Sequence, residues 1–183
     1  MNKENSPQPK PDLKQAILHM TAEGREDFLL YLKNIGLLSE PNILVLSPGQ
    51  HYYYDESDLR SLKILVNMKK LNLVRHLDRF LHNLYRILPP EASFIGCFSD
   101  SATERAYNVK HGYSSGKLLS SIRNLFGYIT EQKMSGIKVS EILKTHGFKI
   151  IDMSEINGVT FFWSRNVAVP IKGNHNDYLI YFR

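Results

Sequence analysis

The chain has 183 residues, enough for one domain with a substantial hydrophobic core and too few for two ordinary domains. Its hydrophobic share of 43% and charged share of 22% are typical of globular proteins, and its net charge of +5 fits an anionic partner without specifying one. The single cysteine, Cys97, excludes a disulfide within the chain and a zinc cluster built on cysteines.

Residues 1–11 are polar, contain three prolines and lack apolar periodicity, so we expect a disordered lead-in there. A single domain is expected over 12–183, with its core at 42–166. The sequence contains no recognisable signal peptide and no run approaching the ~20 apolar residues that span a bilayer. We therefore expect a cytoplasmic protein, with any membrane contact at the inner face of the membrane.

Apolar residues recur at helical spacing over 12–38 and predict helical structure in this segment. Gly24 is expected to divide the segment into two helices, with Thr21 as a candidate N-cap of the second helix. Gly36 is a candidate for the residue that ends the second helix.

Three short apolar runs predict central strands, at 42–46, 62–66 and 92–98. Between the second and third run, residues 73–88 predict a helix with one broad apolar face. Asn72 is a candidate cap for its start, and Pro89-Pro90 should end it. The residues outside the apolar face are polar or charged: Arg75, Asp78, Arg79, His82 and Arg86.

Residues 99–136 are expected to form an insert, which holds the amphipathic segment Lys117–Ile129. This segment fits either a membrane interface or a helix packed on the core. Residues 139–146 then predict a short helix that ends before Gly147. Strands at 148–153 and 159–163, joined by Asn157-Gly158, predict a β-hairpin.

The alternation of strands and helices predicts an α/β fold with parallel strands. The expected architecture is a reduced Rossmann-like, mostly parallel sheet with a C-terminal antiparallel β-hairpin and a helical N-terminal segment.

This order resembles the C-terminal half of a class I S-adenosylmethionine-dependent methyltransferase. The segment 77–90 is similar to the family's helix and following junction, and 147–163 is similar to its closing hairpin. A narrower resemblance is to the methyltransferase-like segments of bacterial exopolysaccharide-biosynthesis proteins, which occur with a sugar-transferase domain. It implies an accessory module of polysaccharide biosynthesis that docks on a sugar-transferase partner, with peripheral membrane contact through Lys117–Ile129.

The sequence departs from the methyltransferase family at the cofactor loop, which in the family is rich in glycine so that the backbone can approach the ligand. The corresponding segment 46–50 has one glycine, and no acidic residue can be placed to hold ribose hydroxyls. We therefore expect a non-catalytic module without a cofactor. An active methyltransferase that binds S-adenosylmethionine through a divergent loop, and a sugar- or nucleotide-sugar-binding module, remain the alternatives.

Ligands of open α/β sheets bind beyond the carboxyl ends of the strands. By this rule the candidate cofactor-binding residues are Ser47, Pro48 and Gly49 after the first strand and Asn67 and Lys69 at the second. The alternatives are an ordinary tight turn and a solvated loop.

No catalytic residue and no metal site is expected. Cys97 lies in an apolar run, which favours a buried and inert thiol. The histidines lack metal-ligand spacing. The tyrosines at 52–54 are not interleaved with basic residues, so no nucleic-acid partner is expected.

Overall fold

The computed structural model describes residues 12–48, 59–100 and 133–167. The expected lead-in at 1–11, the candidate ligand residue Gly49 and the amphipathic segment Lys117–Ile129 lie outside the described residues.

The described chain forms a five-stranded sheet with the strand order β1-β2-β3-β5-β4. Strands β1, β2 and β3 pair in parallel, whereas β5 is antiparallel to both of its neighbours, β3 and β4. Only β5 therefore runs opposite to the other strands, which confirms the predicted mostly parallel α/β sheet with an antiparallel final strand. The strand bounds are β1 Ile43–Leu46, β2 Ile64–Asn67, β3 Ser93–Phe98, β4 Phe148–Ile156 and β5 Val159–Asn166.

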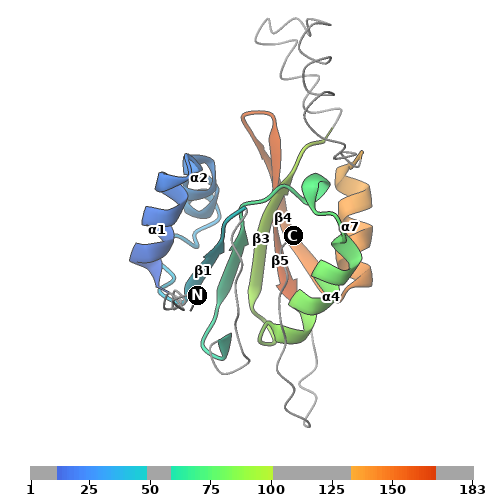
Figure 1. Ribbon diagram of the computed structural model, residues 1–183, viewed down its shortest axis with the longest axis horizontal. Coiled ribbons are helices and arrows are strands. Elements are labelled where there is room, and N and C mark those ends of the chain that lie inside the picture. The colour runs from blue at the N-terminus through green and yellow to red at the C-terminus, as the bar shows by residue number, and fades with distance from the viewer. Residues whose placement is uncertain (1–11, 49–58, 101–132, 168–183) are drawn as a thin grey trace, which may run out of the picture.

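Helices cover both faces of the sheet (Figure 1). Helices α1 (Leu13–Ala22) and α2 (Glu26–Asn34) pack on one face, and α4 (Leu77–Ile87) and α7 (Gly136–Thr145) pack on the other. The central strands are buried on both faces, because alternate residues point into opposite layers. Leu44 and Phe94 contact the α4/α7 layer, while Val45 and Ile95 contact the α1/α2 layer.

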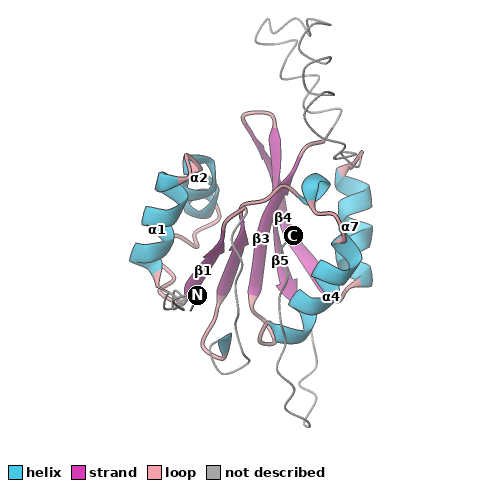
Figure 2. Cartoon of the chain, in the orientation of Figure 1, coloured by secondary structure: helices cyan, strands magenta, loops and turns pink. Residues whose placement is uncertain are grey.

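The secondary structure in Figure 2 agrees with most of the predicted elements, but two predicted helix caps are wrong. Helix α1 continues to Ala22, so Thr21 lies in its last turn, and the chain reverses at Gly24, whose φ is +62°. Asn72 lies in a short 3-10 turn, Leu71–Leu73, and α4 begins only after His76. The tighter turn delays the helix because the chain must first cross from β2 to the face that α4 covers.

The predicted helix ends and the hairpin turn are confirmed. Gly36 and Gly147 each follow the end of a helix with a positive φ, which glycine adopts at low cost. Asn157 and Gly158 have φ values of 51° and 77°, the signs that a two-residue hairpin turn requires. The hairpin is longer than predicted, because β4 and β5 each extend three residues beyond the predicted strands.

Candidate functional site at the carboxyl ends of the parallel strands

The parallel strands bring the predicted residues of the described chain to one edge of the sheet. Leu46, at the end of β1, is in register with Asn67, at the end of β2. Ser47 and Pro48 follow the first of these residues, and Lys69 follows the second. The strand-end rule therefore placed Ser47, Pro48, Asn67 and Lys69 at a common edge.

Two of these side chains make hydrogen bonds within the protein. Ser47 is buried, and its Oγ lies 2.7 Å from Nε2 of His19 in α1. Asn67 is 1% exposed; its Nδ2 donates to the Lys69 carbonyl at 2.9 Å, and its Oδ1 accepts from the Lys69 amide at 3.3 Å. These two hydrogen bonds of Asn67 stabilise the turn after β2. Pro48, after β1, is exposed. The half-buried Lys69 ammonium has no hydrogen bond or ion pair with another described residue.

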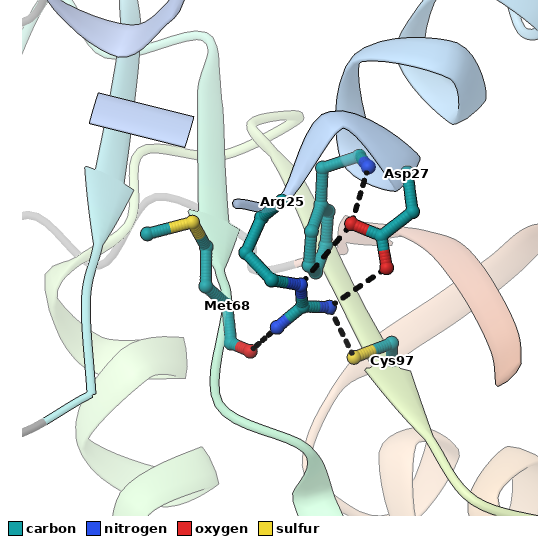
Figure 3. Close-up of polar contacts among 5 residues, drawn as sticks. Arg25, Asp27, Met68 and Cys97 are labelled. Carbon is teal, nitrogen blue, oxygen red and sulfur yellow. Dashed lines mark hydrogen bonds and ion pairs between the residues drawn. The ribbon is translucent and has the colours of Figure 1, made fainter. Parts of the chain in front are cut away.

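Arg25, at the junction of α1 and α2, places its guanidinium across the ends of β2 and β3 (Figure 3). Its Nη1 donates to the carbonyl of Met68, the residue after β2, and its Nη2 lies 3.5 Å from Sγ of Cys97 in β3. Asp27 holds the guanidinium in place, with its Oδ1 3.1 Å from Nε and its Oδ2 3.2 Å from Nη2. The guanidinium carbon also lies 4.6 Å from the centre of the Phe28 ring.

Their surroundings keep the Arg25 guanidinium charged and the Cys97 thiol neutral. Burial, the largest single influence, lowers the pKa of Arg25, but the hydrogen bonds and charge interactions with Asp27 and Cys97 together outweigh it, and the pKa is raised. Burial raises the pKa of the Cys97 thiol, and the nearby Arg25 charge offsets this effect only in part. Cys97 is buried, as predicted, and a fully buried neutral thiol is a poor nucleophile.

A third group of polar residues fixes the end of β3. Asn72 accepts from the Ser99 amide at 2.7 Å and donates to the Ser99 carbonyl at 3.0 Å. The Lys70 ammonium donates to Ser99 Oγ at 2.8 Å. Asp100 forms an isolated backbone β-bridge with Met134, and its side chain accepts a hydrogen bond from the Gly136 amide at 3.2 Å. The two ends of the predicted insert, 99–136, therefore lie side by side at this edge.

The sequence prediction missed Arg25, Asp27 and His19 as residues of the strand-end region. The segment "EGRED" is a short charged run at a break between two helices, and such runs usually face solvent. Only the packing of α2 against the sheet brings Arg25 to Met68 and Cys97. A half-buried cation needs a fixed anion, and the carboxylate of Asp27 two residues later was the one available signal.

In 12–48, 59–100 and 133–167, no three His, Cys, Asp or Glu side chains lie close enough together to hold a metal ion. Within the same ranges, no helix has both the length and the apolar character to cross a membrane.

No family model matches the chain, and no curated protein matches it. Among solved structures, a methyltransferase from Thermotoga maritima that depends on S-adenosylmethionine shares 16% identity, with 72% of this chain and 68% of that one covered and a TM-score of 0.43. A chain from a complex that contains the Haloferax volcanii Trm112 methyltransferase activator shares 12% identity, with 72% and 62% covered and a TM-score of 0.45. The magnesium protoporphyrin IX methyltransferase of Synechocystis shares 12% identity, with 74% and 57% covered and a TM-score of 0.38.

Several of the similar solved structures are thus methyltransferases. This chain spans about three fifths of the length of the Haloferax and Synechocystis chains.

Proposed function

We propose that the chain is a methyltransferase-like module that does not transfer methyl groups and serves as an accessory in polysaccharide biosynthesis. The observation that carries the non-catalytic part is the position of Arg25. Its guanidinium already donates a hydrogen bond to the Met68 carbonyl, just after β2. A ligand of an open α/β sheet binds beyond the strand ends and would need such an acceptor.

The charge of this group also disfavours the methyl donor. S-adenosylmethionine carries a positive sulfonium, and a second positive charge held at the strand ends repels it. Asp27 compensates for Arg25, but both of its oxygens are engaged with that guanidinium. At the strand ends on the α1/α2 side, the polar groups of Arg25 and Asp27 are therefore already hydrogen-bonded within the protein, which leaves few of them to bind a cofactor.

Calorimetric titration with S-adenosylmethionine and S-adenosylhomocysteine tests the non-catalytic part. We expect no binding in the micromolar range, which corresponds to about −8 kcal/mol. Micromolar binding by the natural sequence would contradict the non-catalytic part and favour the alternative, an active methyltransferase with a divergent loop. Arg25→Ala is the informative variant, because binding that appears only in this variant identifies the guanidinium as the blocking group.

The accessory role rests on the resemblance to methyltransferase-like segments of exopolysaccharide-biosynthesis proteins. It requires a sugar-transferase partner at the inner face of the membrane. Co-expression with each sugar transferase of the same cell, followed by affinity purification, tests this role. A stable complex with one of these enzymes is expected, and recovery of the chain alone in every case contradicts the role.

The half-buried Lys69 favours a second candidate, a module that binds a sugar phosphate or nucleotide sugar. An ammonium without a bonded partner in the described structure is suited to a phosphate group at the strand ends. Titration with UDP-glucose tests this candidate. If it is correct, Lys69→Ala should weaken binding at least tenfold, whereas Lys63→Ala, at the amino end of the same strand, should leave it unchanged. Equal effects of the two variants would dismiss Lys69 as a ligand-binding residue.

A further inference from the structure

The outer surface of the α4/α7 layer is strongly basic. The segments 74–88 and 133–146 contain six lysines and arginines but two carboxylates, and all eight side chains are exposed. The cations are Arg75, Arg79, Arg86, Lys133, Lys138 and Lys144, and the carboxylates are Asp78 and Glu141. These two described segments therefore carry a net charge of +4.

The α1/α2 layer on the opposite face has the reverse balance. Residues 12–40 contain three cations, Lys14, Arg25 and Lys33, against five carboxylates: Asp12, Glu23, Glu26, Asp27 and Glu40. Of the two helical layers, only α4/α7 therefore has a net positive charge in its described residues, as expected for a surface that meets an anionic partner.

The basic residues form one surface and not two separate stripes. Arg79, His82 and Arg86 follow one another at intervals of three and four residues, so they lie along one exposed side of α4, and the exposed Arg75 lies just before the helix. Helix α7 lies on the same face of the sheet as α4 (Figure 1). Arg75, Arg79 and Ile142 of α7 line a common hollow of about 320 Å³.

An exposed isoleucine accompanies these charges. Ile137, in the first turn of α7, is 76% exposed, the highest value among the exposed large hydrophobic residues of the described chain. Its neighbour Lys138 is exposed, as are Glu141 one turn further along α7 and Lys144 two turns further along. Basic residues around an apolar side chain suit the boundary between lipid headgroups and acyl chains.

We propose that the outer face of α4 and α7 binds an anionic membrane surface. A broad array of cations on two adjacent helices needs no shaped partner and matches a plane of negative headgroups. Ile137 then enters the headgroup layer next to Lys138. A single-stranded nucleic acid is favoured less, because none of the exposed large hydrophobic side chains of the described residues is aromatic and able to stack on bases. This inference is independent of the proposed function.

Vesicle flotation with the full chain tests the membrane surface. The vesicles consist of phosphatidylcholine alone or of equal parts phosphatidylcholine and phosphatidylglycerol. We expect binding to the mixed vesicles and not to the neutral ones. Each basic residue near an anionic surface strengthens binding by roughly fivefold, so Arg79→Ala with Lys144→Ala should weaken it roughly 25-fold. Ile137→Ser should give a several-fold loss.

The matched control removes two exposed lysines from the other layer, Lys14→Ala with Lys33→Ala. This variant loses the same charge, and Lys33 and Lys144 each lie in the last turn of a helix. It should bind the mixed vesicles within a factor of about two of the natural chain, since its charges face away from the bilayer. Unchanged circular dichroism and melting temperature show that both variants are folded.

Three results would overturn the proposal: no binding to mixed vesicles, equal binding to neutral vesicles, and equal losses in the two double variants. A competition with short single-stranded DNA covers the other polyanion. If the DNA displaces the chain from vesicles at phosphate concentrations well below that of the lipid, the basic face is a nucleic-acid surface and the membrane proposal is wrong.

Discussion

The two helical layers of this protein use charge in opposite ways. In the α1/α2 layer, charged and polar side chains reach inward: Arg25 bonds to the end of β2, and Tyr31 donates to Asp152 of β4 at 2.8 Å. In the α4/α7 layer, the contacts with the sheet are mainly aliphatic and aromatic, and the lysines and arginines of the two helices are exposed. Inward charges fix the position of a helix, whereas outward charges lie on the surface that a partner would meet.

Contacts between aromatic rings hold the α4/α7 layer on the sheet without charges. Phe94 lies 5.4 Å from Phe162, centre to centre, and 5.5 Å from Phe148. Phe80 of α4 lies 6.2 Å from Phe94. Such contacts tolerate changes of salt and pH, which makes this layer a stable platform for the basic residues on its outside.

The largest effect that separates the layers should come from a cavity in the apolar one. Leu84 of α4 is fully buried, so Leu84→Ala should lower the free energy of unfolding by about 3 kcal/mol, through lost burial and the space left behind. Urea unfolding measures this change. Leu30→Ala, at an exposed position of α2, is the control and should change stability by less than about 1 kcal/mol. Similar losses in both variants would contradict the assignment of Leu84 to the core.

A smaller but still clear effect should follow from removal of the inward charge of the other layer. Asp27→Ala leaves the half-buried Arg25 guanidinium without its anion. We expect a loss of about 2 kcal/mol, less than for a fully buried pair because water reaches both side chains.

Urea unfolding of Asp27→Ala, Arg25→Met and the double variant tests the coupling of this pair. The double variant should be more stable than the sum of the two single losses predicts, because it leaves no unpaired charge. Strict additivity would show that Arg25 and Asp27 do not act as a pair.

The sequence predicted the sheet well because the strands are buried on both faces. A run such as "ILVL" at 43–46 has few alternatives to a central strand, and Asn157-Gly158 requires a specific turn geometry. The helix starts were less predictable, since capping depends on how the chain enters each helix. Thr21 and Asn72 have the right side chains for a cap, yet Thr21 lies inside α1 and Asn72 is bonded to Ser99.

The candidate site was predicted in part, for a similar reason. The strand-end rule uses chain order and therefore found Ser47, Asn67 and Lys69. It gives no information on helices that fold back over the sheet, so it missed His19 and Arg25. His19 precedes Ser47 by 28 residues, and no local pattern links the two before the sheet and α1 are packed together.

Tyr31→Phe should have a modest effect on stability that depends on pH. At neutral pH the lost hydrogen bond to Asp152 should lower stability by about 1 kcal/mol. Burial, followed by the hydrogen bond to Asp152, raises the pKa of Tyr31 well above its ordinary value of 10.0. Above that pH the unfolded chain releases the Tyr31 proton while the folded chain keeps it, so the natural chain loses stability as pH rises.

Phenylalanine does not titrate, so the stability of Tyr31→Phe lacks this pH dependence. The difference in unfolding free energy between the natural chain and the variant should therefore shrink by about 1.4 kcal/mol per pH unit above pH 10 and vanish at about pH 11. Urea unfolding at neutral pH and at about pH 11 measures this change. A difference that stays constant over this range would mean that Tyr31 is not protected from ionisation in the folded protein.

The smallest effect on stability, and the sharpest test of the comparison, comes from the outward charges. Arg79→Ala with Lys144→Ala should change the free energy of unfolding by less than about 0.5 kcal/mol, because exposed charges contribute little to folding. The same pair is expected to weaken vesicle binding strongly, whereas Asp27→Ala should destabilise the fold and leave vesicle binding intact at temperatures where the variant is folded. If loss of the outward charges instead destabilised the chain as much as loss of Asp27, the basic face would serve the fold, and the division of labour between the two layers would be wrong.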